Sequence, residues 1–362
     1  MNVLGLMSGT SADGVDLALA RLEGRPPELR WELLERRSVP YPEGLFAQVR
    51  QAQQDRALGP RDLAWLHHDL GRFYAEAAAP FRGRAELAAL AGQTVWHEPP
   101  GVTWQLGEPG WLAEALGVPV VHDFRPADLA AGGEGAPLVP YPDLLLYGEE
   151  GARRSIHNLG GISNLTYLPG RDAAGVLAFD TGPGNCLIDE AAARLGERYD
   201  AGGEIATEGR VDEELVEVWF NHAYLRRPPP KSTGREVWRL GRLAFADRLE
   251  GADLVATVTA FTVRTIVAAY HDFVLPRGLD EVWVSGGGTA NRTLMAGIRA
   301  GLPLPVRSFD EAGHDPLARE ALAFAVLGYL RWLELPNVLP HTTGAARAAL
   351  AGRVTLPAKE QT

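Results

Sequence analysis

Two apolar runs separated by a turn rich in glycine and hydroxyl side chains occupy residues 2–22, and this segment constrains the fold most strongly. The runs predict two strands of a β-hairpin, and the turn between them includes Ser8, Gly9 and Gly14. Glycine permits positive φ and close backbone approach, and successive N–H groups in such turns form concavities that bind anions. The segment therefore predicts an anion-binding hairpin, with an ordinary hairpin carrying polar turn residues as the alternative.

The carboxylates of this turn indicate what kind of anion it would hold. Asp13 and Asp16 would repel a phosphate unless a cation lay between them and the phosphate oxygens. We therefore interpret the turn as a site for a metal-bridged nucleotide phosphate. Its candidate cofactor-binding residues are Gly9, Thr10, Ser11, Ala12, Asp13, Gly14, Val15 and Asp16.

Length and loop composition predict two α/β domains. A chain of 362 residues corresponds to about two domains of ordinary size. A loop rich in glycine and alanine at 130–136 is followed by Pro137, Pro140 and Pro142, and we place the boundary here, between 1–134 and 135–362. Each half opens with a strand, a glycine turn and a strand, the pattern expected of a duplicated α/β domain.

Charge and composition exclude several classes of function. The net charge of −11 disfavours a nucleic-acid partner, which selects a basic surface. Cys186 is the single cysteine, so no intramolecular disulfide forms and a reducing compartment is expected. No apolar run reaches the roughly 18 residues of a membrane span, and no basic segment marks a secretory signal. We expect a cytoplasmic protein with no membrane partner.

Asp180 is the strongest candidate for a catalytic carboxylate. It follows a short apolar strand predicted at 175–179, and open α/β sheets bind ligands at the carboxyl ends of their strands. Glycines after it lead into a helix expected from Cys186, whose N-terminus favours an anion. An aspartate here can accept a proton from a nucleophile. An aspartate that only caps the turn or the helix is the alternative.

Other polar residues also follow predicted buried strands. Thr94 comes after the strand at 87–91, and Asp123 and Arg125 come after the strand at 118–121. These residues could contact sugar hydroxyls, a carboxylate or a phosphate, or they could form a structural Asp–Arg pair. Glu320 lies on a helix predicted at 316–333, where a lone acid usually faces solvent.

Glycines after the strand predicted at 281–285 could let a ring or phosphate lie against the backbone of Gly286 and Gly287. The dinucleotide fingerprint G-x-G-x-x-G does not match there. The phosphate-loop signature is also absent, because Pro230 rather than glycine precedes Lys231. A Rossmann dehydrogenase and a P-loop nucleotidase are therefore disfavoured.

Ordered short motifs along nearly the whole chain resemble those of the anhydro-N-acetylmuramic acid kinases. The strings are Gly-Leu-Met-Ser-Gly-Thr-Ser-Ala-Asp-Gly-Val-Asp (5–16), Gly-Gln-Thr (92–94), Asp-Phe-Arg (123–125), Gly-Gly-Glu-Gly-Ala-Pro (132–137), Asn-Leu-Gly-Gly-Ile-Ser-Asn (158–164), Phe-Asp-Thr-Gly-Pro-Gly-Asn (179–185), Pro-Pro-Lys-Ser-Thr-Gly-Arg-Glu (229–236), Gly-Gly-Gly (286–288), Glu-Ala-Leu-Ala-Phe-Ala (320–325) and Thr-Gly-Ala (343–345). The resemblance implies a two-domain sugar kinase/Hsp70/actin-like (ribonuclease H-like duplicated) α/β fold with an interdomain cleft.

The resemblance also implies a reaction. Members of this family use ATP and Mg²⁺ to open the 1,6-anhydro ring of anhydro-N-acetylmuramic acid with water and to phosphorylate O6. The products are N-acetylmuramic acid 6-phosphate and ADP, within cell-wall (peptidoglycan) recycling. The implied partner is thus a small amino sugar, whereas a homodimer and any metal-binding side chains stay open.

The same resemblance assigns roles to residues of this chain. It implies that 9–16 hold the phosphates of ATP and that Asp180 activates the water. Further nucleotide-binding candidates are Gly160, Gly161, Gly286 and Gly287, and the sugar-site candidates are Thr94, Asp123, Arg125 and Glu320. Trp96 departs from the family pattern, which usually has arginine there, and this puts an anionic contact from position 96 in doubt.

Three other functions are compatible with such a fold, because fold alone does not decide function. A kinase for an ordinary hexose or a carboxylic acid would phosphorylate its substrate without consuming water. An ATP-gated binding or chaperone-like protein would need a peptide-binding segment, for which the chain has no long extra region. A regulator that binds the sugar without turnover is disfavoured by the intact Asp180 and hairpin.

Overall fold

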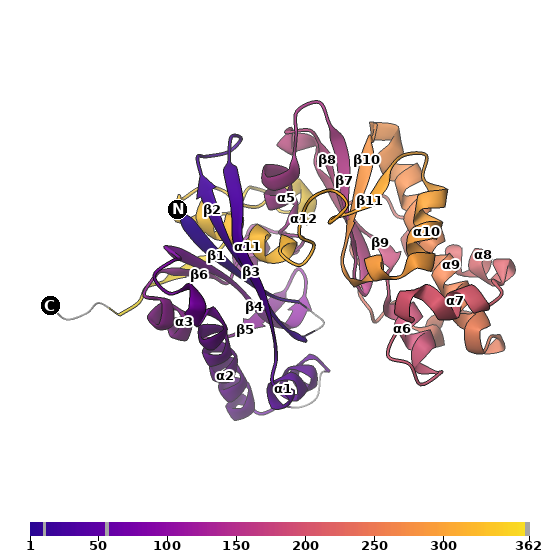
Figure 1. The fold of residues 1–362 in the computed structure, drawn as a ribbon, viewed down its shortest axis with the longest axis horizontal. Helices are drawn as coiled ribbons and strands as arrows, with labels where there is room; N and C mark the ends of the chain where they lie inside the picture. Colours follow the sequence, from indigo (N-terminus) through magenta and orange to yellow (C-terminus); the bar gives the residue numbers. More distant parts are fainter. Residues whose placement is uncertain (10–11, 55–57, 359–362) are drawn as a thin grey trace. The chain divides into compact units, whose positions relative to one another are not determined.

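The computed structural model describes residues 1–9, 12–54 and 58–358, and it divides into two compact units (Figure 1). Unit 1 comprises Met1–Tyr147 and Leu317–Thr362, and unit 2 comprises Gly148–Pro316. Each unit has its own β-sheet and its own hydrophobic core. The chain therefore leaves unit 1 to build unit 2 and returns to unit 1 at its end.

The sheet of unit 1 has seven strands. In spatial order they are β12 (Arg353–Thr355), β6 (Val120–His122), β4 (Leu87–Glu98), β1 (Asn2–Ser8), β2 (Gly14–Glu23) and β3 (Arg30–Pro40), with β5 (Val102–Leu106) paired to β4. Strands β6, β4 and β1 are parallel, whereas β2 and β3 continue the sheet in antiparallel fashion. The expected hairpin is thus confirmed as β1 and β2.

Helices cover both faces of this sheet because side chains of its central strands alternate between two buried faces. The helices are α1 (Glu43–Gln53), α2 (Pro60–Ala78), α3 (Pro109–Leu116), α4 (Arg125–Ala130), α5 (Pro140–Tyr147), α11 (Arg319–Trp332) and α12 (Pro340–Thr343). Leu4 and Leu6 of β1 belong to the core shared with α1, α2 and α3. Gly5, between them, faces α11, where a Cβ would lie 1.8 Å from the Ala321 carbonyl oxygen.

Unit 2 has a five-stranded sheet. The strands, in spatial order, are β11 (Val306–Ser308), β10 (Glu281–Ser285), β7 (Arg153–Leu159), β8 (Ile162–Pro169) and β9 (Leu177–Pro183). Its helices are α6 (Cys186–Ala193), α7 (Glu204–Glu208), α8 (Glu213–Phe220), α9 (Gly251–Ala269) and α10 (Arg292–Gly301). Helix α9 is the most buried of these, and it packs against α6, α7, α8 and α10.

The two units repeat one topology. In unit 1 the order β6-β4-β1-β2-β3 has three parallel strands followed by two antiparallel ones. In unit 2 the order β11-β10-β7-β8-β9 has the same directions. The first strand of each unit forms a hairpin with the second and lies beside a strand from later in the chain. The predicted duplicated α/β fold is therefore confirmed.

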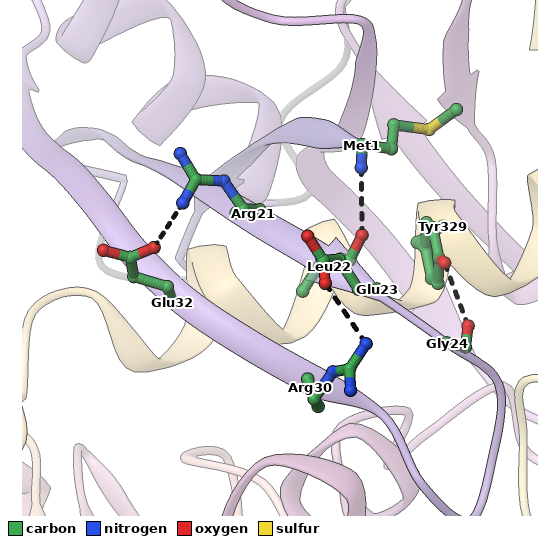
Figure 2. Close-up of polar contacts among 8 residues, drawn as sticks. All are labelled: Met1, Arg21, Leu22, Glu23, Gly24, Arg30, Glu32 and Tyr329. Atoms are coloured by element: carbon green, nitrogen blue, oxygen red, sulfur yellow. Dashed lines mark hydrogen bonds and ion pairs between the residues drawn. The ribbon is translucent and has the colours of Figure 1, made fainter.

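Three sets of contacts stabilise the end of the β1–β2 hairpin that lies opposite its turn (Figure 2). The amino group of Met1 donates a hydrogen bond to the Leu22 carbonyl over 3.1 Å. The hydroxyl of Tyr329, on α11, donates to the Gly24 carbonyl over 2.9 Å. Two exposed ion pairs, Arg21–Glu32 and Arg30–Glu23, join β2 to β3. Because surface pairs contribute little, the backbone contacts and α11 account for most of this anchoring.

The compact units divide the chain differently from the boundary expected at residue 134. Unit 1 continues to Tyr147, and Leu317–Thr362 belongs to it rather than to unit 2. Helix α11 packs against β1, β2 and β4. Its Arg319 makes a bidentate ion pair with Asp143 of α5, with Nη2–Oδ2 at 2.6 Å, and both side chains are almost fully buried. This buried ion pair joins α5 to α11, which are distant in the sequence. Local sequence patterns do not predict such a contact.

Prolines at 140 and 142 mark a helix rather than a linker. Pro140 is the first residue of α5, where the fixed φ and missing N–H of proline are tolerated. The strand expected at 87–91 is also longer, since β4 runs to Glu98 and pairs with the unexpected β5. A left-handed Gly92, with φ of +73°, lies where one extra residue of β4 shifts its register with β1.

One helix in the described part of the chain, Gly251–Arg277, is long and apolar enough to cross a membrane by length and composition alone. Of its most apolar window, 61% is buried inside the fold, which is the behaviour of a core helix in a soluble protein.

Candidate functional site

Asp180 lies inside β9, the edge strand of the unit 2 sheet, rather than after the end of a strand as expected. Ser163 pairs with Gly182 and Asn164 pairs with Asp180, so Thr181 is the extra residue of a β-bulge. Bulges bend a strand and redirect the neighbouring side chains, and they are common beside active sites. The half-buried Asp180 side chain therefore has a local structural reason for its orientation.

Backbone and side-chain groups from two other segments hold Asp180. The Thr233 N–H donates to the Asp180 carboxylate oxygen Oδ2 over 2.9 Å. The Asp180 N–H donates to the Lys231 carbonyl over 3.1 Å, and the Tyr224 hydroxyl donates to the Asp180 carbonyl over 2.7 Å. An aspartate that merely caps its own turn would accept from residues just after it. This carboxylate instead accepts from a residue 53 positions away.

The glycine residues predicted in unit 2 come together beside the β7–β8 turn. The carbonyls of Gly160 and Gly161 accept hydrogen bonds from the N–H groups of Gly184, Asn185 and Cys186, where α6 begins. Gly286 has φ of +89°, and a Cβ there would lie 2.4 Å from Oδ1 of Asn158. Three motifs that are distant in sequence, at 158–164, 179–185 and 286–288, are thus neighbours in unit 2.

A buried polar network lies under the β7–β8 hairpin. The two ring nitrogens of His157 contact the Tyr270 hydroxyl at 3.1 Å and the Ser163 hydroxyl at 2.7 Å. Thr181 donates to the Ser163 hydroxyl over 2.7 Å, and Ser155 contacts the Tyr270 hydroxyl at 2.9 Å. Buried polar groups are retained when each is satisfied. Because Thr181 adjoins Asp180, this network supports the bulge from beneath.

The turn between β1 and β2 rests on a second buried network, which we call the hairpin network: Ser8, Tyr41, Tyr74 and Gln93. The Tyr41 hydroxyl contacts Ser8 at 2.9 Å, Tyr74 at 3.0 Å and Gln93 at 3.0 Å. Burial raises the pKa of Tyr41 to about 12 and raises the pKa of Tyr74, so both hydroxyls stay protonated near neutral pH. Gln93 in turn donates from Nε2 to the Gly9 carbonyl over 3.1 Å.

Most of the predicted phosphate hairpin belongs to the described residues, whereas Thr10 and Ser11 lie outside them. The Ala12 N–H donates to the Gly9 carbonyl, and Ala12 has a left-handed φ of 57°. The Asp13 carbonyl accepts from Tyr41, and Asp16 accepts a hydrogen bond from Ser38 of β3. Gly14 and Val15 begin β2. These contacts hold both ends of the turn to the hairpin network and to β3.

Three of the four predicted sugar-site residues lie on neighbouring elements of unit 1. Arg125 begins α4, and its Nη1 donates to the Gly135 carbonyl over 2.7 Å. Burial raises the pKa of Glu320, Asp16 and Asp143 add to the rise, and Arg319 and Arg125 oppose it. Glu320 is half-buried, rather than on the solvent-facing side that its helix position alone predicted. The charges of Asp16, on β2, and Arg125, on α4, both act on the pKa of its carboxyl.

Thr94 and His97 contribute from β4. The Thr94 hydroxyl accepts from Gln105 over 3.3 Å. Burial and the charge of Arg125 lower the pKa of His97 to about 4, so its imidazole is neutral near neutral pH. Thr94 is half-buried on the strand that also supplies Gln93 to the hairpin network. The strand thus carries residues of both the predicted phosphate hairpin and the predicted sugar site.

Asp123 has a different partner from the others. It has a left-handed φ of 58°, and its Oδ2 lies 3.2 Å from Nε of the exposed Arg353 on β12. The structural Asp–Arg pair considered from the sequence therefore forms with Arg353 rather than with Arg125. Trp96 is 38% exposed and donates to Glu98 over 3.2 Å.

Asp128 and Thr343 were not singled out from the sequence, although they connect two of the motifs. Both Asp128 oxygens accept hydrogen bonds, from the Gly135 N–H over 2.8 Å and from the Thr343 hydroxyl over 2.7 Å. The Glu134 N–H donates to the Thr343 carbonyl over 2.8 Å. Thr233 and Tyr224 were missed in the same way. Thr343 and Thr233 belong to the motifs at 343–345 and 229–236, whereas Asp128 and Tyr224 lie outside the motifs.

No group of three or more histidine, cysteine, aspartate or glutamate side chains is arranged to hold a metal ion in residues 1–9, 12–54 and 58–358. Mg²⁺ commonly binds one or two carboxylates together with phosphate oxygens and water. The donors that fit this mode beside the predicted phosphate turn are Asp13 and Asp16. The fit is to a nucleotide-borne ion, not to a metal cage made by protein alone.

Two α/β units of one topology, a glycine-rich hairpin in each, and an aspartate held on an edge strand define a protein of the sugar kinase/Hsp70/actin-like group. The family model described as anhydro-N-acetylmuramic acid kinase matches residues 1–357. The chain belongs to the anhydro-N-acetylmuramic acid kinase family, and the resemblance seen in its motifs is confirmed.

Curated relatives with this name cover nearly the whole chain. A protein from Gloeobacter violaceus is 45% identical over 370 residues, which include 97% of each chain. A protein from Prochlorococcus marinus is 43% identical, covering 97% of this chain and 98% of its own. A protein from Bacillus thuringiensis is 37% identical, covering 99% of this chain and 100% of its own. All three are named anhydro-N-acetylmuramic acid kinase.

Proposed function

We propose that this protein is an ATP-dependent kinase that opens the 1,6-anhydro ring of anhydro-N-acetylmuramic acid with water and phosphorylates O6. The products are N-acetylmuramic acid 6-phosphate and ADP, within cell-wall recycling. The observation that carries the proposal is the family match over residues 1–357, together with relatives of that name, such as one that is 45% identical over 97% of its own length. The duplicated α/β fold and the held Asp180 agree with it.

Asp180 is the base in the proposed mechanism. Its carboxylate takes a proton from water while the water oxygen forms a bond to the anomeric carbon C1. The C1–O6 bond breaks, and O6 receives the terminal phosphoryl group as the bond from that phosphorus to ADP breaks. The hydrogen bond from the Thr233 N–H to Oδ2, at 2.9 Å, limits rotation of the carboxylate. Such preorganisation is what general-base catalysis asks of the protein.

Phosphoryl transfer requires chiefly positioning and neutralisation of charge. We infer that the β1–β2 turn, residues 9–16, holds the phosphates of ATP, with Mg²⁺ between them and the carboxylates of Asp13 and Asp16. The glycine cluster of unit 2, which includes Gly160, Gly161, Gly286 and Gly287, is the second proposed nucleotide contact. Mg²⁺ would supply charge neutralisation on the phosphate oxygens when bound.

The sugar contacts are proposed to come from unit 1. Arg125 is suited to the lactyl carboxylate because its guanidinium offers a fork of donors. Thr94 is suited to a sugar hydroxyl, and Glu320 to a hydroxyl or the acetamido N–H. Asp123 is the weakest of these candidates, because its carboxylate already contacts Arg353 at 3.2 Å. We infer a cytoplasmic protein that acts on a small soluble sugar; a homodimer is a further hypothesis.

The test is ADP release by the purified protein with MgATP, with and without anhydro-N-acetylmuramic acid, followed by mass analysis of the sugar product. The proposal expects ADP release that depends on the sugar, and a product that has gained one water and one phosphoryl group. A phosphoryl gain without water would indicate an ordinary sugar kinase instead. Absence of sugar-dependent release would favour a binding or regulatory protein.

A further inference from the structure

Lys231 is a buried lysine in a chain that otherwise uses arginine. Of the 35 basic residues, two are lysine, Lys231 and Lys359. Lys231 is buried, with only 5% of its surface exposed. Its ammonium donates a hydrogen bond to the Leu225 carbonyl over 3.2 Å. Burying an ammonium costs free energy unless its charge is compensated, so other groups near Nζ are expected to stabilise the charge.

Three aromatic rings, which we call the lysine cage, surround that ammonium. Nζ lies 5.0 Å from the ring centre of Phe273, 5.1 Å from that of Tyr224 and 5.6 Å from that of Phe179. A cation near the face of an aromatic ring is attracted by the negative face of its quadrupole. An ammonium is compact, whereas the planar guanidinium of arginine is larger and requires different partners. The cage therefore explains why lysine occurs here.

Two of the three rings of the cage, Phe179 and Tyr224, are connected to Asp180. Phe179 directly precedes it in β9, and the Tyr224 hydroxyl donates to the Asp180 carbonyl over 2.7 Å. Lys231 itself accepts at its carbonyl from the Asp180 N–H, and two residues later the Thr233 N–H donates to the Asp180 carboxylate. The Trp238 indole also donates to the Thr233 hydroxyl over 3.0 Å, which fixes the far side of this segment.

Three charged groups act on the Lys231 ammonium from the elements around it. Burial is the largest cause that lowers the pKa of Lys231 to about 8, and Arg227 lowers it further, whereas Asp272 and Asp180 oppose the decrease. Arg227 and Asp272 are exposed. Arg227 follows the segment that carries Tyr224, and Asp272 lies with Phe273 in the π-helical segment Tyr270–Val274. The Lys231 ammonium therefore loses its proton as the pH rises through about 8.

We propose that Lys231 is a positioning residue for the reaction, whose caged ammonium holds residues 231–233 in the place where they orient the Asp180 carboxylate. This inference rests on the proposed function, in which Asp180 is the base. The lysine does not contact the reacting atoms. It acts through the backbone of its own segment and through the cage wall Tyr224.

The first test compares wild-type protein with Lys231→Met, which keeps the length of the side chain and removes its charge. We expect kcat for sugar-dependent ADP release to fall about tenfold to a hundredfold, the range for a displaced catalytic group. We expect KM for ATP and for the sugar to change less than about twofold, since binding groups are not moved. A purely structural role would lower the amount of folded protein without this split.

The second test is the pH dependence of kcat. For the wild type we expect kcat to decrease above about pH 8, where Lys231 loses its proton. We expect Arg227→Met to move this decrease to higher pH, because a repelling charge is removed. Asp272→Asn should move it to lower pH. Both substitutions are at exposed positions, so these variants keep the test valid if Lys231→Met does not fold.

The outcomes separate the two levels of inference. A wild-type protein without sugar-dependent ADP release refutes the proposed function, and the inference about Lys231 falls with it. An active wild type whose kcat is unchanged by Lys231→Met, or whose alkaline decrease does not respond to Arg227→Met and Asp272→Asn, refutes the role of Lys231 alone.

Discussion

The first hairpin of unit 1 and the first hairpin of unit 2 have the same place in the same topology, but they are built differently. Five residues separate β1 from β2, and two separate β7 from β8. The short turn is covered by the start of α6, because the carbonyls of Gly160 and Gly161 accept three of its N–H groups. The long turn contains Asp13, and the carbonyls of Gly9 and Asp13 accept hydrogen bonds from Gln93 and from the Tyr41 N–H.

The supports beneath the two hairpins also differ. The hairpin network of unit 1 consists of hydroxyls and one amide, none of which changes charge near neutral pH, since both tyrosine pKa values are raised. The network of unit 2 includes His157, which contacts Ser163. Ser163 in turn accepts a hydrogen bond from Thr181, the residue directly after Asp180. The two hairpins therefore have equivalent positions in their sheets but different supports, which are uncharged hydroxyls and an amide in unit 1 and a histidine-containing network beside Asp180 in unit 2.

The buried ion pair of unit 1 offers the largest test of how independent the two units are. Asp143→Asn leaves the charge of Arg319 buried without its partner, and breaking such a pair typically costs about 3–5 kcal/mol. We expect unit 1 to unfold at a lower temperature while unit 2, which lacks this pair, is unchanged. Calorimetry would show one shifted transition. Glu149→Gln, which removes an exposed partner of Arg154 in unit 2, is the control; an equal effect of both would contradict the expectation.

Asp180→Asn tests the division of labour between the hairpins. We expect turnover to fall at least about a hundredfold, the lower end of general-base effects, which corresponds to about 2.7 kcal/mol of activation free energy. Binding of ATP should be retained, because neither proposed nucleotide contact, the turn at 9–16 or the glycine cluster of unit 2, includes the Asp180 carboxylate. Steady-state ADP release and calorimetric titration with the nucleotide would measure the two quantities. Near-normal turnover would remove Asp180 from the mechanism.

A matched pair of tyrosine substitutions compares the two networks directly. Tyr74→Phe and Tyr270→Phe each remove one buried hydroxyl that has two hydrogen-bonding side-chain partners. We expect each to lower the free energy of unfolding by about 1–3 kcal/mol. Tyr74→Phe should mainly raise KM for ATP, and Tyr270→Phe should mainly lower kcat. Denaturant unfolding and kinetics would measure both, and the same kinetic signature in both variants would contradict the comparison.

The stability of unit 2 should depend on pH through Lys231. Its pKa is about 8 in the folded chain and 10.5 ordinarily, so between these values the unfolded chain binds more protons. Stability from this group is therefore complete above pH 10.5, and it is lost as the pH falls through about 8. The slope is at most about 1.4 kcal/mol per pH unit. Unfolding of the wild type should show this slope relative to Lys231→Met, and parallel curves would contradict it.

Local patterns predicted a large part of this architecture. Apolar runs and glycine turns located both hairpins, and the helix expected at 109–116 is α3 with the same limits. The ordered motifs indicated the family. We expected a domain boundary near Pro140 and Pro142, and both lie in helix α5 of unit 1, because a proline at the start of a helix looks the same in sequence as a proline in a loop. Local patterns also placed Glu320 in solvent, because one helix in isolation does not show what covers it.

The sequence by itself determined the elements, the repeat of strand, glycine turn and strand, and the family, because these depend on residues that are close together in the chain. The tertiary structure decided that Arg319 returns to Asp143, that Thr233 and Tyr224 donate to Asp180, and that Asp123 contacts Arg353 instead of Arg125. These contacts join residues up to 230 positions apart. They depend on burial and charge compensation, which arise only when the sheets and helices have packed.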